Sequence, residues 1–455
     1  MRPLPELFCA NMRTQLGEVE AERLFEALDG ASPTSVRYNP HKGEVPSGGR
    51  VIPWSVDGRY LDERPQFTLD TAFAAGAYYV QEAGSQFVDY IARANGVGEG
   101  ATVLDMCAAP GGKSTLYSTL VGREGLVLAN EYVRNRAYVL ADNVRKWGIG
   151  NVVVTNNDPV HISAFEHWFD MVAVDAPCSG EGMFRKDDEA RAEWSEENVR
   201  MCASRQVSIL QEAWKCLKPN GLLIYSTCTF NAMEDEGVLK TFMEEFADEI
   251  ECAEPMQVDA LWGIEKGMEG AFQTFRFLPH KVEAEGFFAA VARKRGDVGG
   301  RKAEPKSRKK IMNDAPKEAV KELSRFVKEP ESMRFAEVGD TLYGYEVSRY
   351  QQIKRLAEVL TVVYSGVAMG QIFKGKLKPE WALSQYVGFN QDAVPCREVS
   401  EADALNYLRK QDISASQFEE GLNLVLHDDR ALGFVKRIGA RCNNMYPNSL
   451  KIINL

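Results

Sequence analysis

ATVLDMCAAPGGKSTLYSTLV, residues 101–121, is the stretch that decides the fold class of this chain. The apolar run 101–106 predicts a buried strand, and GGKSTLYSTLV directly after it predicts a short helix. Small residues form the turn between them, and such a turn lets the backbone approach a ligand closely. A strand, a small-residue turn and a helix in this order indicate an α/β sheet that binds its ligand where the strands end.

The same strand pattern recurs along the middle of the chain. Four more apolar runs predict strands at 125–131, 151–158, 170–177 and 221–229. Helical segments separate them: one buries Ala137, Leu140, Ala141, Val144 and Trp147 and stops at Gly148, and another starts at Ser195 and ends at Pro219–Gly221. Segments 271–279 and 286–294 are predicted to pair as an antiparallel hairpin. Continuous apolar strands that alternate with helices predict a doubly wound α/β domain over 96–296.

The rest of the chain divides into smaller units, because 455 residues are too many for one compact core. Residues 1–95 begin with helical periodicity and continue as irregular segments rich in Pro and Gly. A basic linker is expected at 297–318, a mixed α and β unit at 319–390, and a small β-rich unit at 391–455. The last unit contains a predicted hairpin with its turn at Asp428–Asp429.

The chain has a formal net charge of −11, but the segment around the linker is basic. Only Asp297 and Glu304 oppose nine basic residues, namely Arg293, Lys294, Arg295, Arg301, Lys302, Lys306, Arg308, Lys309 and Lys310. A solvated linker and a phosphate-contacting segment both explain this composition, and the two interpretations stand about even.

Composition and histidine and cysteine usage exclude several classes of protein. No run reaches the roughly 18 apolar residues of a membrane span, and the start lacks a signal-peptide core, so we expect a cytoplasmic protein. Nine scattered cysteines without a CxxC pair indicate reduced thiols, of which Cys202 and Cys216 are expected in helix packing. The five histidines are dispersed, so no metal site is predicted.

Two cysteines stand where parallel strands end. Cys178 lies in DMVAVDAPCSG, just after one apolar run, and Cys228 follows another in GLLIYSTC. Pro177 fixes the turn that would let Asp175 and Cys178 face the same side. Thiols at this edge of an open sheet favour covalent catalysis over packing.

Acidic residues end the neighbouring strands. Glu131, Asp158 and Asp175 each close a predicted strand, and the first two stand at positions suited to a ribose and an adenine edge. Cys107 stands where a Walker A loop needs glycine, and GxGxxG is absent. Each acid alone is more often an ordinary loop residue, but the series together predicts a nucleoside-like ligand across the sheet.

The motifs DMCAAPGGK, NE, NND, DAPCSGEGMFRK and YSTCTF resemble the NOL1/NOP2/Sun family of RNA cytosine-5 methyltransferases, in its bacterial RsmF-type ribosomal RNA branch. YYVQEAGSQ, residues 78–86, matches as well. The ending LGFVKRIGARCNNMYPNSLKI is similar to a PUA-like domain, and 319–390 is similar in position to a ferredoxin-like domain.

The resemblance implies a class I methyltransferase fold at 96–296 that uses S-adenosylmethionine, with 1–95 as an RNA-binding extension. Cys228 would be the nucleophile, Cys178 would release the product, and Asp175 would lie near the methyl donor and the base. Glu131 would bind the ribose and Asp158 the adenine. The cofactor loop would consist of Cys107, Ala108, Ala109, Pro110, Gly111, Gly112 and Lys113.

This chemistry needs a thiol, because carbon 5 of cytosine becomes nucleophilic only after a thiolate attacks carbon 6. The base must leave its stack to react, so single-stranded or loop RNA is the expected substrate form. By resemblance the substrate is small-subunit (16S) ribosomal RNA, free or in the small ribosomal subunit, and a monomeric enzyme is expected. A transfer RNA methyltransferase and a non-catalytic RNA-binding assembly factor remain as alternatives.

Several polar residues remain open to two interpretations. Lys113 is expected either to contact base or cofactor or to cap a helix, and His280 is expected to shape a loop. The terminal unit offers an RNA face or an ordinary polar loop at Arg437, Arg441, Asn443, Asn444 and Tyr446.

Overall fold

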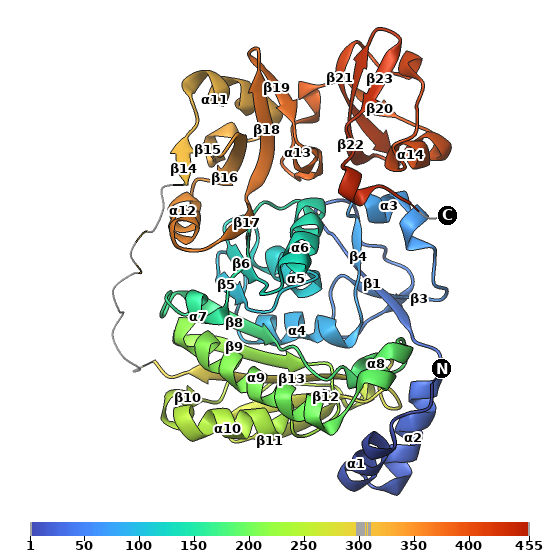
Figure 1. Ribbon diagram of the computed structural model, residues 1–455, viewed down its shortest axis with the longest axis vertical. Coiled ribbons are helices and arrows are strands. Elements are labelled where there is room, and N and C mark those ends of the chain that lie inside the picture. Colours follow the sequence, from blue (N-terminus) through green and yellow to red (C-terminus); the bar gives the residue numbers. More distant parts are fainter. Residues whose placement is uncertain (1, 297–304, 306, 308–310, 454–455) are drawn as a thin grey trace.

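A computed structural model describes residues 2–296, 305, 307 and 311–453. Its centre is a ten-stranded sheet with the order β11-β12-β13-β9-β8-β5-β6-β7-β17, to which β10 adds at β13 (Figure 1). Five of these strands are parallel and are the ones expected from the apolar runs: β5 (Thr102–Asp105), β6 (Leu126–Asn130), β7 (Val152–Thr155), β8 (Phe169–Asp175) and β9 (Leu217–Thr227). The predicted parallel sheet is therefore confirmed.

The strand order reverses at β5. After β5 the chain builds β6 and β7 on one side, and then crosses to build β8 and β9 on the other. Ligands of open α/β sheets bind outside the carboxyl ends of the strands at such a reversal. The glycine-rich turn after β5 and the acid at the end of β8 both lie at this point.

Antiparallel strands complete the far side of the sheet. β12 (Phe272–Phe277) and β13 (Phe287–Lys294) pair as the predicted hairpin, and β13 inserts between β12 and β9. β11 (Glu265–Glu269) pairs β12, and β10 (Ile250–Glu251) pairs β13.

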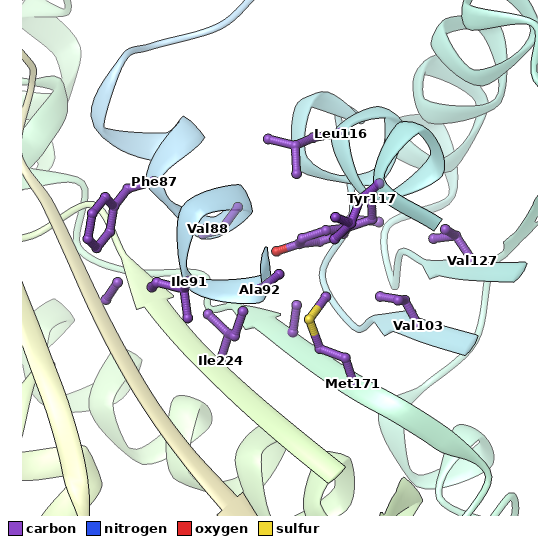
Figure 2. Close-up of a cluster of buried hydrophobic side chains, with 14 of the residues drawn as sticks. Phe87, Val88, Ile91, Ala92, Val103, Leu116, Tyr117, Val127, Met171 and Ile224 are labelled. Carbon is purple, nitrogen blue, oxygen red and sulfur yellow. The ribbon is translucent and has the colours of Figure 1, made fainter. Parts of the chain in front are cut away.

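Helices cover both faces of the sheet, as predicted for buried parallel strands. α4 (Phe87–Ala94), α5 (Gly112–Val121) and α6 (Arg134–Trp147) share one core with Val103 and Val127, which Figure 2 shows in part. α9 (Glu196–Cys216) and α10 (Glu236–Phe246) share the other core with Leu104 and Leu128. Short α7 (Pro159–Ile162) lies on this second side, and α8 (Asp188–Glu193) precedes α9.

The ends of α6 and α9 can be compared with the capping residues predicted from the sequence. Gly148 closes α6 in a left-handed conformation (φ 85°), and the Ser195 side chain accepts from the backbone N–H of Asn198 at the start of α9. The predicted end of this helix at Pro219–Gly221 is wrong, because α9 stops at Cys216. From Leu217 onward the backbone pairs with β8 and forms β9, so sheet pairing replaces the last turn.

The N-terminal region combines two helices with a small sheet. α1 (Glu6–Leu16) and α2 (Glu18–Asp29) precede β1 (Thr34–Tyr38), β2 (Arg50–Val51), β3 (Gly58–Leu61), α3 (Thr71–Ala74) and β4 (Tyr78–Val80). Phe8 of α1 packs against Phe184, Trp194 and Phe230, which belong to the central α/β region.

The third region forms an antiparallel sheet in chain order. Its strands are β14 (Met312–Asp314), β15 (Met333–Val338), β16 (Thr341–Glu346), β18 (Val367–Phe373) and β19 (Lys376–Pro379), with α11 (Lys317–Leu323), α12 (Tyr350–Val359) and α13 (Trp381–Gln385). This order differs from the split β-α-β arrangement that the ferredoxin-like expectation implies. β14 also begins inside the segment expected as linker. β17 (Val362–Ser365) leaves this sheet and pairs β7 of the central one.

The last region contains the predicted terminal hairpin. β21 (Gly421–His427) and β22 (Arg430–Ile438) pair around Asp428 and Asp429, whose φ angles of 49° and 58° suit a two-residue hairpin turn. β20 (Cys396–Glu398) and β23 (Arg441–Asn444) flank them, and α14 (Glu401–Leu408) packs beside β21.

Three of the nine basic residues lie at the end of β13 or directly after it. Arg293 donates to the carbonyls of Asn220 and Asn95, Lys294 to that of Trp214, and Arg295 to that of Ile250, so these three cations stabilise the fold. The other six basic residues of the set lie outside the described residues. Within the part of the chain that the structure describes, no helix is long and apolar enough to cross a membrane.

Candidate active site

The two cysteines meet at the carboxyl edge of the sheet. Asp175 of β8 pairs in parallel register with Ser226 of β9, and Cys178 lies three residues after Asp175 and Cys228 two residues after Ser226. Their Sγ atoms lie 3.1 Å apart, and both side chains are half-buried. The hydrogen bond with Cys228, together with burial, raises the pKa of Cys178 well above its ordinary value.

Beside the thiols lies an ion pair. Lys113 Nζ of α5 is 2.9 Å from Asp175 Oδ2, and the Ser226 hydroxyl donates to Asp175 Oδ1 at 2.8 Å. The ammonium also lies 5.2 Å from the Phe287 ring centroid. Burial alone lowers the pKa of Lys113, but the attraction of Asp175 outweighs it and the net shift is upward. Lys113 therefore points to the reacting edge as a cation and does not serve as a helix cap.

The glycine-rich turn approaches the neighbouring helix closely. Gly111 precedes α5 with φ 116°, and a Cβ there would lie 3.0 Å from Cδ1 of Leu140. From α6, Arg136 donates to the Ala109 carbonyl and Asn143 donates to the Pro110 carbonyl, both at 2.9 Å. These contacts hold the turn so that the N-terminus of α5 faces the sheet edge, a favourable place for an anionic group.

Glu131 and Asp158 lie at the ends of β6 and β7, as predicted. Buried Glu131 accepts from the backbone N–H of Val133 at 2.7 Å and lies 3.6 Å from the Arg136 guanidinium. Asp158 accepts from the backbone N–H of Val160 at 3.0 Å and caps α7. Both acids thus shape the backbone at the strand ends, and their contacts with a nucleoside stay predictions.

An acid and a thiol at the end of β5, Asp105 and Cys107, both have raised pKa values. Burial raises the pKa of Asp105 to about 7, against the opposing effect of its 2.7 Å hydrogen bond from Ser114. Asp105 Oδ1 is buried and has no hydrogen-bond partner in the described part of the chain. Burial and the nearby carboxylates of Asp105, Asp175 and Glu131 raise the pKa of Cys107 well above its usual value. Cys107 is therefore a poor nucleophile.

The N-terminal region contacts the reacting loops. Gln15 of α1 donates to the Phe230 carbonyl at 2.7 Å and accepts from the Ala232 N–H at 3.0 Å, both just after Cys228. Arg37 of β1 donates to the Gly112 carbonyl at 3.1 Å. The predicted RNA-binding role of this extension is untested, but the extension does support both loops of the site.

Three family models match the chain. They are 16S rRNA methyltransferase RsmB/F over 96–293, the N-terminal domain of 16S rRNA methyltransferase RsmF over 4–83, and the methyltransferase RsmF PUA domain over 395–452. Ribosomal RNA small subunit methyltransferase F of Aeromonas salmonicida is 31% identical over 423 residues, which cover 88% of this chain and 85% of that protein. The chain belongs to the RsmF family of 16S ribosomal RNA methyltransferases. The Escherichia coli K12 member of the RsmF family is 31% identical over 419 residues, covering 88% and 84% of the two chains.

Solved structures agree with the fold of this RsmF-family chain. A methyltransferase homolog protein from Pyrococcus horikoshii is 27% identical, with a TM-score of 0.54, over 64% of this chain and 95% of that one. The crystal structure of NSun6 from the same organism with SFG is 20% identical, with a TM-score of 0.52, over 64% and 98%. The predicted class I methyltransferase fold with a C-terminal PUA-like domain is confirmed.

Sequence reasoning missed a buried polar framework behind the thiols of this RsmF-family site. Glu181 and Glu234 are fully buried, and Gln206 of α9 lies between Pro177 and Glu234. Gly182 approaches the backbone so closely that a Cβ would lie 2.8 Å from the Cys228 carbonyl oxygen. The only sequence signal is position, since both acids follow a cysteine within six residues, and exposed acids share that spacing.

The residues of the candidate RNA face in the PUA-like region differ in how far they are exposed to solvent. Tyr446 is buried, with its ring 5.8 Å from Trp381 and 5.5 Å from Tyr407, so its predicted base-stacking role is wrong. Asn444 binds backbone groups, and Arg437 donates to the carbonyls of Phe418 and Gly439. Arg441 and Asn443 are exposed and remain predicted RNA contacts.

Two smaller predictions concern histidines. His280 Nε2 lies 3.1 Å from Glu20 of α2, which agrees with the predicted loop-shaping role. Within the described residues, the ligand atoms of Glu398, His427 and Asp428 come within 4.8 Å of one another on the terminal hairpin. Because exposed acidic groups of this kind are common without an ion, they carry no assignment, and the predicted absence of a metal stays a prediction.

Proposed function

We propose that this RsmF-family chain methylates carbon 5 of a cytosine in 16S ribosomal RNA through a covalent adduct with Cys228. The single observation that carries the proposal is the contact of the Cys178 and Cys228 thiols beside the Lys113–Asp175 ion pair. Two thiols, one cation and one carboxylate on adjacent strand ends are the groups that such an adduct needs. Packing alone does not require them at a ligand-binding edge.

Residues 107–113, Glu131, Asp158 and Asp175 would hold S-adenosylmethionine, which supplies the methyl group when bound. The buried Asp105 Oδ1 without a partner in the described part of the chain fits a ligand with hydrogen-bond donors at this edge. The N-terminus of α5 suits a carboxylate, and Glu131 and Asp158 suit a ribose and an adenine. The residues present therefore fit the cofactor.

In the proposed reaction the Cys228 thiolate attacks carbon 6 of the flipped base and makes carbon 5 nucleophilic. Lys113, held as an ammonium by Asp175, stabilises negative charge as the adduct forms. After carbon 5 has been methylated, its remaining proton passes to water, the electron pair of that carbon–hydrogen bond forms the carbon 5–carbon 6 double bond, and Cys228 Sγ leaves with the electron pair of its bond to carbon 6. Cys178 lies against that sulfur and is placed to assist the release.

The RNA must present its cytosine outside a stack, so a loop or an opened segment of the small ribosomal subunit is the proposed substrate. This activity places the protein in the cytoplasm with the ribosome. Arg441 and Asn443, exposed on the PUA-like region, are proposed to contact the RNA backbone.

Mapping of 5-methylcytosine in ribosomal and transfer RNA, with and without this gene, tests the proposal. We expect one or more 16S positions to lose the mark and to regain it with the unaltered protein but not with Cys228→Ala. Cys178→Ala is expected to accumulate a protein–RNA adduct on denaturing gels. Loss of marks in transfer RNA instead would establish that alternative substrate. Full complementation by Cys228→Ala would favour a non-catalytic assembly role.

A further inference from the structure

Glu234 joins the two thiol-bearing loops through one buried carboxylate. Its Oε2 accepts from the backbone N–H of Ser179 at 2.9 Å, directly after Cys178. Its Oε1 accepts from Asn231 Nδ2 at 2.9 Å, three residues after Cys228. The side chain has no solvent exposure. Glu234 therefore helps to fix the relative position of the two loops, together with Glu181, which accepts from the Phe230 N–H, and Gly182, whose N–H donates to the Cys228 carbonyl.

Neighbouring side chains fix the carboxylate in turn. Gln206 of α9 donates to Glu234 Oε2 at 2.7 Å and to the Pro177 carbonyl at 3.1 Å. The Tyr225 hydroxyl of β9 donates to the Glu234 carbonyl at 2.6 Å. These hydrogen bonds join Glu234 to the two loops that carry the thiols, to β9, which precedes Cys228, and to helix α9.

All of the hydrogen-bond donors to this carboxylate are uncharged. Among the described residues, no lysine, arginine or histidine forms an ion pair with Glu234. A buried carboxylate without a cation is costly, but both of its oxygens accept here, whereas a glutamine has one acceptor oxygen and would turn its NH2 group against a donor. The hydrogen-bond pattern at this position therefore requires a carboxylate.

We propose that Glu234 is a positioning residue that holds Cys178 against Cys228 and keeps Cys178 as a neutral thiol. This inference deepens the proposed function and rests on it for the division of work between the thiols. With Cys178 neutral, Cys228 alone supplies the attacking thiolate, and Cys178 keeps a proton that it gives to the Cys228 sulfur as the carbon–sulfur bond breaks. The framework thus decides which sulfur attacks, a choice that the symmetric contact of two thiols leaves open.

The charges around Cys178 agree with this role. The pKa of Cys178 is raised well above its ordinary value by the hydrogen bond with Cys228, by burial, and by the negative charges of Cys228 and Glu234. Tyr225 of β9 also faces this thiol, but burial raises the pKa of Tyr225 well above its usual value and keeps it neutral. Asp175 lies three residues before Cys178 and is paired with Lys113.

The first experiment measures the pH at which Cys178 reacts with iodoacetamide, resolved peptide by peptide in a Cys228→Ser background. We expect Glu234→Gln to lower the midpoint by about one pH unit, because it removes a nearby negative charge. Glu181→Gln is the matched control. Glu181 is equally buried and bonds the N–H of Phe230, but it makes no hydrogen bond to Ser179. An unchanged midpoint in Glu234→Gln, or an equal shift in both variants, overturns the proposal.

The second experiment measures turnover and adduct in the chain with both cysteines present. We expect Glu234→Gln to lower kcat about tenfold, with KM for RNA nearly unchanged, and to accumulate adduct on denaturing gels. Glu234→Asp keeps the charge but is too short to reach both loops. It should lower kcat without moving the Cys178 midpoint, and it serves if the glutamine variant does not fold. Unaltered kcat in Glu234→Asp contradicts the positioning role.

The alkylation experiment needs no RNA, so its failure is distinct from failure of the proposed function. If Cys228→Ala abolishes methylation while Glu234→Gln leaves the Cys178 midpoint in place, only this inference is lost. If Cys228→Ala retains methylation, the proposed function is lost whatever Cys178 does.

Discussion

The Asp175 carboxylate accepts a 2.8 Å hydrogen bond from the hydroxyl of Ser226, its direct neighbour in the parallel register of β8 and β9. This one pairing aligns the ends of two strands that lie 51 positions apart in the sequence. The turns that follow then bring their cysteines together. A slip of one residue would turn the following side chains to opposite faces.

Thiols that are already in contact should oxidise to a disulfide. Hydrogen peroxide is expected to convert one thiolate to a sulfenic acid, from which the other sulfur displaces water. Methyl transfer should then be lost and should return with dithiothreitol. Mass spectrometry of unreduced peptides should find residues 178 and 228 linked. Buried Cys202 and Cys216 should stay unlinked, and absence of the 178–228 linkage after peroxide would contradict the observed contact.

The close approach at Gly182 predicts a sharp difference between two glycines of one motif. A Cβ at Gly182 would lie 2.6 Å from the Gly286 carbonyl oxygen and 2.8 Å from that of Cys228, so Gly182→Ala must displace the backbone of the proposed nucleophile. We expect a loss of activity of about a hundredfold. Gly180 has φ 80° and open space, so Gly180→Ala should cost only about 1 kcal/mol in stability and keep most activity. Steady-state rates and thermal unfolding measure both effects, and equal rates in the two variants would refute the argument.

Asp105 should make stability depend on pH. Its pKa is raised to about 7 by burial, whereas in the unfolded chain it is about 4. Between these values the folded state holds a proton that the unfolded state has lost, so this contribution to stability falls as the pH rises.

Asp105→Asn removes that dependence. The stability of the variant relative to the unaltered protein should therefore increase between pH 4 and 7, by about 1.4 kcal/mol for each pH unit. Urea unfolding at several pH values measures the difference. A difference that is constant across this range would show that Asp105 titrates normally.

Two substitutions in the terminal region should have separate effects, one on stability and the other on RNA binding. Tyr446→Ala removes a ring buried between Trp381 and Tyr407 and should cost about 3–5 kcal/mol in stability. Arg441→Ala changes an exposed side chain. It should leave unfolding unaltered and reduce the salt dependence of RNA binding by about one phosphate contact. If Arg441→Ala destabilises the protein and Tyr446→Ala does not, the assignment is reversed.

Much of the central sheet was predictable, because apolar runs, caps and glycine stops are local signals. Gly148 and Ser195 marked helix ends, and Asp428–Asp429 marked a hairpin turn. The end of α9 was misjudged because pairing with β8, a contact distant in sequence, decides where the strand starts.

The residues of the candidate site also differ in whether a local sequence signal reveals them. Cys178, Cys228 and Asp175 were found because strand ends are visible in the sequence. Glu234 was not, because its proposed importance comes from the loss of all solvent contact and from hydrogen bonds donated by Ser179 and Gln206, which are distant in the sequence. Tyr446 was misassigned because a tyrosine in a polar stretch gives no sign of which rings surround it.

The pairing of β17 with β7 has a consequence for any shortened form of the protein. Val362 and Ser365 pair with Thr155 and Val153, so a strand from the far side of the basic segment protects the rim of the central sheet. A chain cut after residue 296 would retain each residue of the proposed chemistry and yet expose the backbone amides of β7. An exposed edge strand of this kind promotes self-association of the protein. The catalytic body is thus completed by a segment that follows it by more than sixty residues, and insolubility of the truncated chain would reflect that missing strand.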